Sequence, residues 1–188
     1  MNIHGFGEAL GQRIAATRLG ARFLDEKTFE KEVLVKTAWE LSRANPEIRV
    51  FTHPWKRKAE CQPTCEAAGR NFRNRVEGCP ACWKRSKKRN VADVFGMRNN
   101  FDVAAVDQAE GSLVVEVKWL RFKENKGPNS EFQRFVGQCA LAAAANDVVI
   151  GVCGLWGRRE KQLDEHEKPF QEALEKVGVR LVVLRGWA

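Results

Sequence analysis

Three ionisable residues at short spacing could form a catalytic site on two neighbouring strands. Asp102 lies in the segment FDVAAVD, and Glu116 and Lys118 follow it by 14 and 16 residues in SLVVEVKWL. Residues two apart in a strand leave the same face, and cross-strand pairing can bring Asp102 beside them. Two carboxylates are the ligands that Mg²⁺ or Mn²⁺ prefers, and a nearby lysine can orient a water molecule. Taken alone, the pattern is explained equally well by an exposed hairpin whose charges face water.

Four of the six cysteines form a second motif. They follow the spacing C-x3-C-x13-C-x2-C, at Cys61, Cys65, Cys79 and Cys82. Two close pairs separated by a short loop suit a tetrahedral Zn²⁺ site, and four protein ligands leave no open position, so we expect this zinc to be structural. A redox pair at Cys79 and Cys82 would leave the other two unexplained. Cys139 and Cys153 lie in apolar segments and are expected in the core.

Positive charge is concentrated around these four cysteines. The chain has 32 Lys and Arg against 24 Asp and Glu, and segment 56–90 alone holds 11 Lys and Arg against 3 Glu, which leaves 21 of each sign elsewhere. Such a local excess indicates an anionic partner, most often nucleic acid, although a solvated loop has the same composition. The candidate nucleic-acid-binding residues are Lys56, Arg57, Lys58, Arg70, Arg73, Arg75, Lys84, Arg85, Lys87, Lys88 and Arg89.

Composition excludes several classes of protein. Hydrophobic residues make up 44% and charged residues 30%, as in ordinary globular proteins. The longest apolar run, residues 139–145, is far shorter than the roughly 20 residues that span a bilayer, and the N-terminus has no apolar signal region. We therefore expect a reducing, cytoplasmic location and no membrane partner. The three histidines lie in no deaminase or HNH context, and no ATP-binding loop is present.

The rest of the sequence alternates between helical and strand-like segments. Periodicity predicts helices over 29–44, 130–146 and 164–177, and strands over 47–53, 101–107, 112–120, 147–155 and 179–184. Asp25 or Thr28 can cap the first helix, Asn45-Pro46 ends it, and Gly111 is expected to supply the turn of a central hairpin. This order predicts one α/β domain over 1–188, a mixed sheet with helices on both faces, carrying an insert at 56–90. A further helix within the first 24 residues is left unplaced.

Phe101-Asp102, followed by Glu116-Val117-Lys118 within this order of elements, resembles the PD-(D/E)XK nuclease superfamily of restriction endonucleases, junction resolvases and repair exonucleases. The shared core is a helix, a strand, a hairpin that carries the motif, a helix and a further strand. The likeness covers residues 29–155, with the zinc segment inserted before the hairpin. Phe101 stands where the family often has proline, at a variable position. The motif is short, so the order of elements carries much of the likeness.

The resemblance implies roles for the hairpin residues. Asp102 and Glu116 would hold a catalytic Mg²⁺ or Mn²⁺ together with the Val117 carbonyl, and Lys118 would be the catalytic lysine. Members often add a glutamate from the preceding helix. Glu30 is the choice here because it shares a face with apolar residues, with Glu32 as the competitor and Glu40 as a poorer fit.

The helix after the motif often carries a glutamine in this family. Gln138 matches it, and Gly137 is expected to let that helix approach the sheet closely, while Gln133 is expected at the surface. An ordinary polar helix position would also explain Gln138.

Together these patterns predict a Mg²⁺-dependent phosphodiesterase that cleaves nucleic acid, DNA in preference to RNA, with the zinc module assisting binding. One alternative is a catalytically silent nucleic-acid-binding protein with a nuclease-like fold. Another is a zinc-stabilised interaction or assembly protein. The intact D…E-x-K pattern argues against the first, and the concentration of cations argues against the second. A homodimer stays open, since many proteins with this core dimerise to cut both strands.

Overall fold

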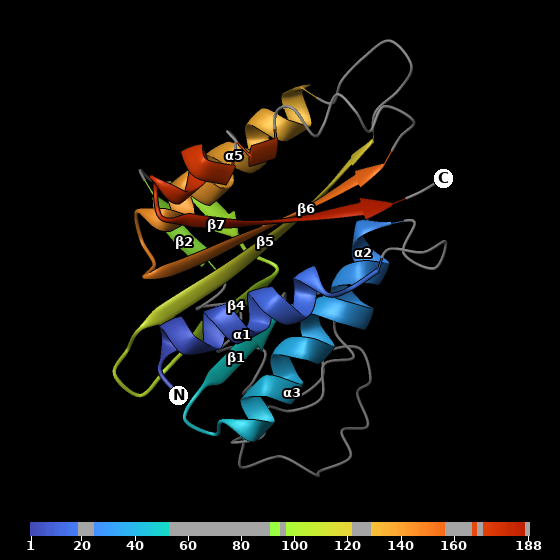
Figure 1. The fold of residues 1–188 in the computed structure, drawn as a ribbon. Coiled ribbons are helices and arrows are strands. Elements are labelled where there is room, and N and C mark those ends of the chain that lie inside the picture. The colour runs from blue at the N-terminus through green and yellow to red at the C-terminus, as the bar shows by residue number, and fades with distance from the viewer. Residues whose placement is uncertain are drawn as a thin grey trace, which may run out of the picture.

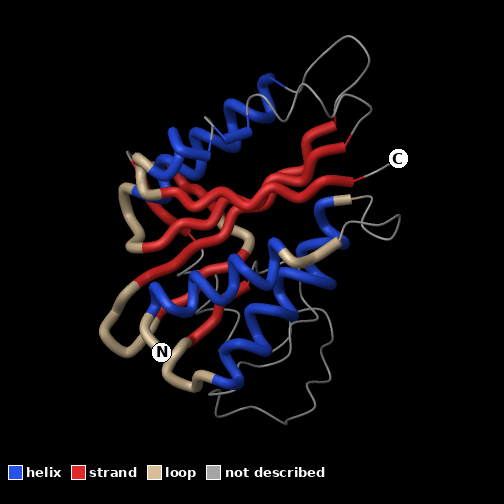
Figure 2. The backbone as a smooth tube through the Cα atoms, in the orientation of Figure 1, coloured by secondary structure: helices blue, strands red, loops and turns tan. Residues whose placement is uncertain are grey.

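A five-stranded mixed β-sheet lies between two layers of helices (Figures 1 and 2). The computed structural model describes residues 1–18, 25–52, 91–94, 97–121, 129–156, 167–168 and 171–186. Segment 56–90, with its four cysteines and its cluster of cations, lies outside the described residues, so the predicted insert stays a prediction.

The strands follow the order β1 (Arg49–Thr52), β4 (Val103–Val106), β5 (Ser112–Arg121), β6 (Val148–Trp156) and β7 (Val179–Gly186) across the sheet. β4 pairs antiparallel with both β1 and β5, whereas β5, β6 and β7 pair parallel. The long apolar runs of β5 and β6 suit strands buried on both faces. The prediction of a mixed sheet with helices on both faces is confirmed.

One face of the sheet is covered by α1 (Ile3–Ala15) and by a continuous helical run. This run consists of α2 (Glu26–Phe29), a π-helical turn η2 (Glu30–Val35) and α3 (Lys36–Ala44). Asp25 caps it, because its Oδ1 accepts a hydrogen bond from the Thr28 N–H at 2.7 Å. The predicted helix is confirmed and ends where expected, but it begins three residues earlier than the apolar periodicity indicated.

The opposite face is covered by α5 (Asn129–Ala143), and residues 171–175 are helical and add Leu174 to the core on this side. Gly178 follows that helix with a φ of 80°, the left-handed geometry that glycine adopts readily, as the predicted helix end requires. No helix within the described part of the chain is long and apolar enough to cross a membrane.

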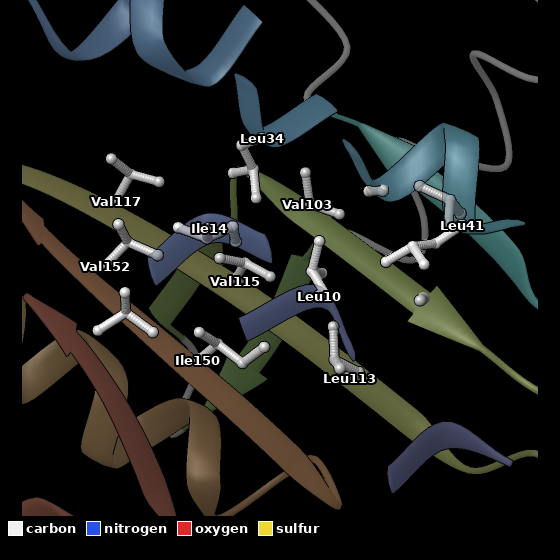
Figure 3. Close-up of a cluster of buried hydrophobic side chains, with 14 of the residues drawn as sticks. Leu10, Ile14, Leu34, Leu41, Val103, Leu113, Val115, Val117, Ile150 and Val152 are labelled. Carbon is white, nitrogen blue, oxygen red and sulfur yellow. The ribbon is translucent and has the colours of Figure 1, made fainter. Parts of the chain in front are cut away.

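Alternating residues of the central strands fill two separate cores. Leu113, Val115 and Val117 of β5 point toward α1 and the α2–α3 run, where they meet Leu10, Ile14 and Leu34 (Figure 3). Val114 and Leu120 point to the α5 side and join Phe135 and Cys139. Since β5 is apolar on both faces, a charged residue on it lies between buried neighbours, which is costly unless the charge has a partner.

Three features differ from the sequence-based expectations or add to them. The N-terminal helix that was left unplaced is α1, and it packs on the sheet. A separate hairpin of β2 (Val91–Val94) and β3 (Met97–Asn100) was not predicted, because four-residue strands containing polar residues carry little periodicity. The predicted β4–β5 hairpin is confirmed, but Glu110, at φ 63°, and not Gly111, adopts the left-handed conformation of its turn.

Replacing Gly154 by alanine is expected to destabilise the fold by about 1–3 kcal/mol through overpacking. Gly154 pairs with Trp119 across β5 and β6, and a Cβ there would lie 2.6 Å from Trp119 Cε3. The indole cannot yield easily, because it is buried and its centroid lies 4.7 Å from that of the Phe29 ring. Urea unfolding of the purified variant measures the loss.

The matched control for this substitution is Gly137→Ala in α5. A Cβ at Gly137 meets no atom of the described residues within 4 Å, so this change should stabilise the helix by about 0.5–1 kcal/mol, the usual gain of alanine over glycine. A Gly154→Ala protein as stable as the wild type would contradict the packing described here. The same observation corrects the expectation that Gly137 permits close approach of helix and sheet. That role belongs to Gly151 of β6, where a Cβ would lie 3.0 Å from Phe135 Cζ.

Candidate active site

The β4–β5 hairpin brings Asp102 against the backbone of β5 on both sides of Glu116. Val103 pairs with Val115, and Asp102 is the residue just before this ladder begins. The Asp102 N–H donates to the Val115 carbonyl at 3.1 Å, and Asp102 Oδ2 accepts from the Val117 N–H at 2.8 Å. Asp102 therefore contacts the two residues that flank Glu116. That the two carboxylates form one site stays a prediction.

Glu116 is a buried carboxylate on the α5 side of the sheet. Only 7% of the residue is exposed, and its neighbours Val115 and Val117 point to the opposite core. Burial raises the pKa of the Cys139 thiol far above its usual value, and the negative charge of Glu116 raises it further. The thiol of α5 and the carboxylate of β5 therefore face the same interior. Burial likewise raises the pKa of Cys153 to about 12, so both thiols stay neutral, as expected of core cysteines.

The second half of β5 extends beyond the end of β4. Residues 113–121 pair with β6 throughout, whereas β4 pairs only as far as Val115. At the edge left open by β4, carboxylates take the backbone N–H groups: Asp102 binds Val117 N–H, and Glu26 Oε2 accepts from the Trp119 N–H at 3.0 Å. The same Glu26 oxygen lies 3.4 Å from the Lys118 Nζ. Lys118 therefore lies two residues from Glu116 and in an ion pair with α2.

The glutamates of the helical run lie in different surroundings, and the one that reaches Lys118 is not among those predicted. Glu30 is completely buried at the start of the π-helical turn, one turn after Glu26. Glu32 is paired with Lys36 at 2.7 Å, and this ion pair lowers the pKa of the Glu32 carboxyl. Glu40 lies 3.8 Å from Arg13 of α1 at the surface. The glutamate that contacts Lys118 is thus Glu26, which the sequence analysis did not single out, while the role of Glu30 stays a prediction.

A sequence signal for Glu26 did exist. Asp25 and Thr28 form a capping pair, and a helix that begins after Asp25 places Glu26 and Glu30 one turn apart, on the same side. On α5, Gln138 is half-buried beside Cys139, and Gln133 is exposed as expected. The role of Gln138 also stays a prediction.

The donor set fits a magnesium-type cation with few protein ligands. Among the described residues, no group of three or more His, Cys, Asp and Glu side chains could hold a metal ion. In these residues, Glu26 and Glu30 therefore do not form such a group with Asp102 and Glu116. Mg²⁺ is commonly held by one or two carboxylates, with water and substrate phosphate completing its shell. The two oxygens of the Asp102 carboxylate offer about four lone-pair sites, and the hydrogen bond from the Val117 N–H uses one of them.

The Val117 carbonyl, predicted as a backbone ligand, lies on the same side as Asp102. The N–H and C=O of one strand residue point to the same neighbour, and the Val117 N–H points to Asp102. Comparison of the chain with protein-family models, with curated proteins and with solved structures found no match.

Proposed function

We propose that this protein is a metal-dependent nuclease that hydrolyses phosphodiester bonds of nucleic acid. The observation that carries the proposal is the contact of Asp102 with the backbone on both sides of the buried Glu116, with Lys118 two residues further along β5. A buried carboxylate near a second carboxylate is costly, which favours a function that uses their combined charge. Cation binding is such a function.

The order of elements supports the same proposal. The helical run, β1, the β4–β5 hairpin, α5 and β6 follow one another as in the PD-(D/E)XK core. In that core the hairpin carries the acidic motif, which is where Asp102 and Glu116 lie. We therefore propose a restriction-endonuclease-like core with the basic segment 56–90 inserted between β1 and the hairpin.

Each residue of the hairpin has a distinct task in the proposed reaction. Asp102, Glu116 and the Val117 carbonyl would hold Mg²⁺ or Mn²⁺. Such a cation, when bound, polarises a phosphate and lowers the pKa of a bound water molecule. The Lys118 ammonium orients the attacking water and offsets the negative charge that develops on the phosphate oxygens. The partly buried position of Lys118 strengthens this interaction relative to bulk water.

Segment 56–90 would supply affinity for the substrate. Its 11 Lys and Arg side chains can contact phosphates, and four thiolates at Cys61, Cys65, Cys79 and Cys82 would hold a structural zinc ion. Binding through phosphates weakens steeply as salt rises, because each contact releases counterions. DNA is the preferred substrate in this proposal, because the proteins that the motif resembles act on DNA.

A cleavage assay tests the proposal directly. The purified protein is incubated with supercoiled plasmid, linear duplex DNA, single-stranded DNA and RNA, in Mg²⁺, Mn²⁺ or EDTA. We expect cleavage of at least one substrate with Mg²⁺ or Mn²⁺, loss of cleavage in EDTA and recovery when excess cation is restored. An Asp102→Asn protein purified in parallel controls for contaminating nucleases, because its side chain can still accept the Val117 N–H bond.

Two outcomes would contradict the proposal. Salt-sensitive binding of nucleic acid without cleavage under any cation condition would favour the silent binding protein. Absence of both binding and cleavage would favour the zinc-stabilised interaction protein.

A further inference from the structure

One carboxylate oxygen joins α2 to two successive residues of β5. Glu26 Oε2 accepts a hydrogen bond from the Trp119 N–H at 3.0 Å and lies 3.4 Å from the Lys118 Nζ. The side chains of Glu26 and Lys118 are 34% and 28% exposed, so the pair lies at the margin of the core. Glu26 thus occupies the edge of β5 that β4 leaves open.

The position of this carboxylate does not depend on Lys118 alone. The backbone N–H of Trp119 belongs to a strand paired with β6, so its direction is fixed by the sheet. The Phe29 ring packs against the Trp119 ring three residues after Glu26, and Asp25 caps the helix directly before it. Two packed elements therefore hold the negative charge in place, and the flexible side chain is that of Lys118.

The ion pair engages the ammonium with a carboxylate other than Asp102 and Glu116. Lys118 leaves the strand two residues after Glu116, within reach of the carboxylates that would hold a cation. Within the described part of the chain, the ion pair of its ammonium is with Glu26 and not with Glu116 or Asp102. An ammonium paired with Glu116 would compete with a cation for the same oxygens.

We propose that Glu26 is a positioning residue for Lys118, a role that rests on the proposed nuclease function. Its charge restrains the ammonium beside the acidic pair without neutralising either carboxylate. Its hydrogen bond to Trp119 anchors this charge to the strand that carries Glu116 and Lys118. Glu26 makes no contact with substrate in this role and acts only through the lysine.

The test is a double-mutant cycle on cleavage. Glu26→Gln removes the charge but keeps a carbonyl oxygen that can accept the Trp119 N–H bond. In the wild-type background we expect kcat to fall about 10- to 100-fold, as for a misplaced catalytic group, with KM little changed. In a Lys118→Ala background the same change should leave the residual kcat unaltered, because the group it positions is gone.

Controls separate positioning from loss of structure. Glu40 lies on the same helical run as Glu26, at the surface, where it pairs with Arg13 of α1. Glu40→Gln removes this surface charge and should leave kcat unchanged. The midpoint of unfolding is measured for every variant. If the Glu26→Gln protein unfolds more easily than the wild type, the Glu26→Asp protein serves as a second comparison, because it keeps the charge. At equal stability, the Glu26→Asp protein should be more active than the Glu26→Gln protein.

The outcomes are distinguishable. Equal losses of kcat from Glu26→Gln in both backgrounds, or no loss in the wild-type background, would overturn the positioning role and leave the nuclease function intact. A wild-type protein that cleaves no nucleic acid with either cation would overturn the nuclease function, and the positioning role with it.

Discussion

Replacing Asp102, Glu116 or Lys118 is expected to lower the rate of nucleic acid cleavage by at least about 100-fold, the usual effect of losing a metal ligand or a positioned catalytic group. Asp102 and Glu116 would no longer provide paired oxygens for the cation, and without Lys118 the attacking water would lose its orienting charge. Single-turnover cleavage with saturating Mg²⁺ measures the effect on chemistry separately from binding. Lys36→Ala, which removes a surface lysine paired with Glu32, should retain the wild-type rate.

The choice of substitution matters at Asp102. Asp102→Ala would leave the buried strand without the acceptor for the Val117 N–H, at a cost of about 1–3 kcal/mol in folding free energy. Asp102→Asn can keep that bond and removes only the charge, so it separates catalysis from stability. For Glu116→Gln we expect stability equal to the wild type or greater, because a buried charge is relieved. A Lys118→Ala protein that cleaves at nearly the wild-type rate would remove the catalytic assignment.

Loss of zinc is expected to be the second large effect. Four cysteine ligands form a closed site, so natively purified protein should contain about one zinc per chain without added metal. Cys61→Ser or Cys82→Ser should lose that zinc, weaken nucleic acid binding and reduce its dependence on salt. Elemental analysis and binding measured across a salt series test both statements. Cys139→Ala, which changes a buried neutral thiol of α5, should retain the zinc.

The sheet should survive the loss of zinc. Among the described residues, β1, β4, β5, β6 and β7 pair only with one another, so we expect their ladder not to require the zinc segment. Limited proteolysis should therefore cut within 56–90 while the core resists. Reduced native protein without zinc would contradict this interpretation and revive a redox role for Cys79 and Cys82. If zinc is present but its loss leaves binding and salt dependence unchanged, the module stabilises local structure and its cations are only a solvated surface.

Local sequence patterns determined most of the secondary structure. The hairpin signal around residues 108–111 predicted the pairing of β4 with β5, and this pairing brings Asp102 to the Val117 N–H, next to Glu116. These inferences succeed because side-chain direction in a strand follows a period of two and a short connection sets the register. The same reasoning predicted the helical run and α5, whose periodicity is strong, but not the β2–β3 hairpin, whose strands are too short to show it.

Only the tertiary structure decided which helix residue joins the site. Glu26 and Trp119 are 93 positions apart in the chain, and their hydrogen bond depends on where β4 ends, where α2 begins and how Phe29 packs on Trp119. The apolar face of the helix predicted Glu30 as the site residue. Glu30 is indeed buried, but the glutamate that contacts Lys118 is Glu26. Periodicity reports which side of a helix is buried. It carries no information about the height at which the helix crosses a strand, because packing between distant elements sets that height.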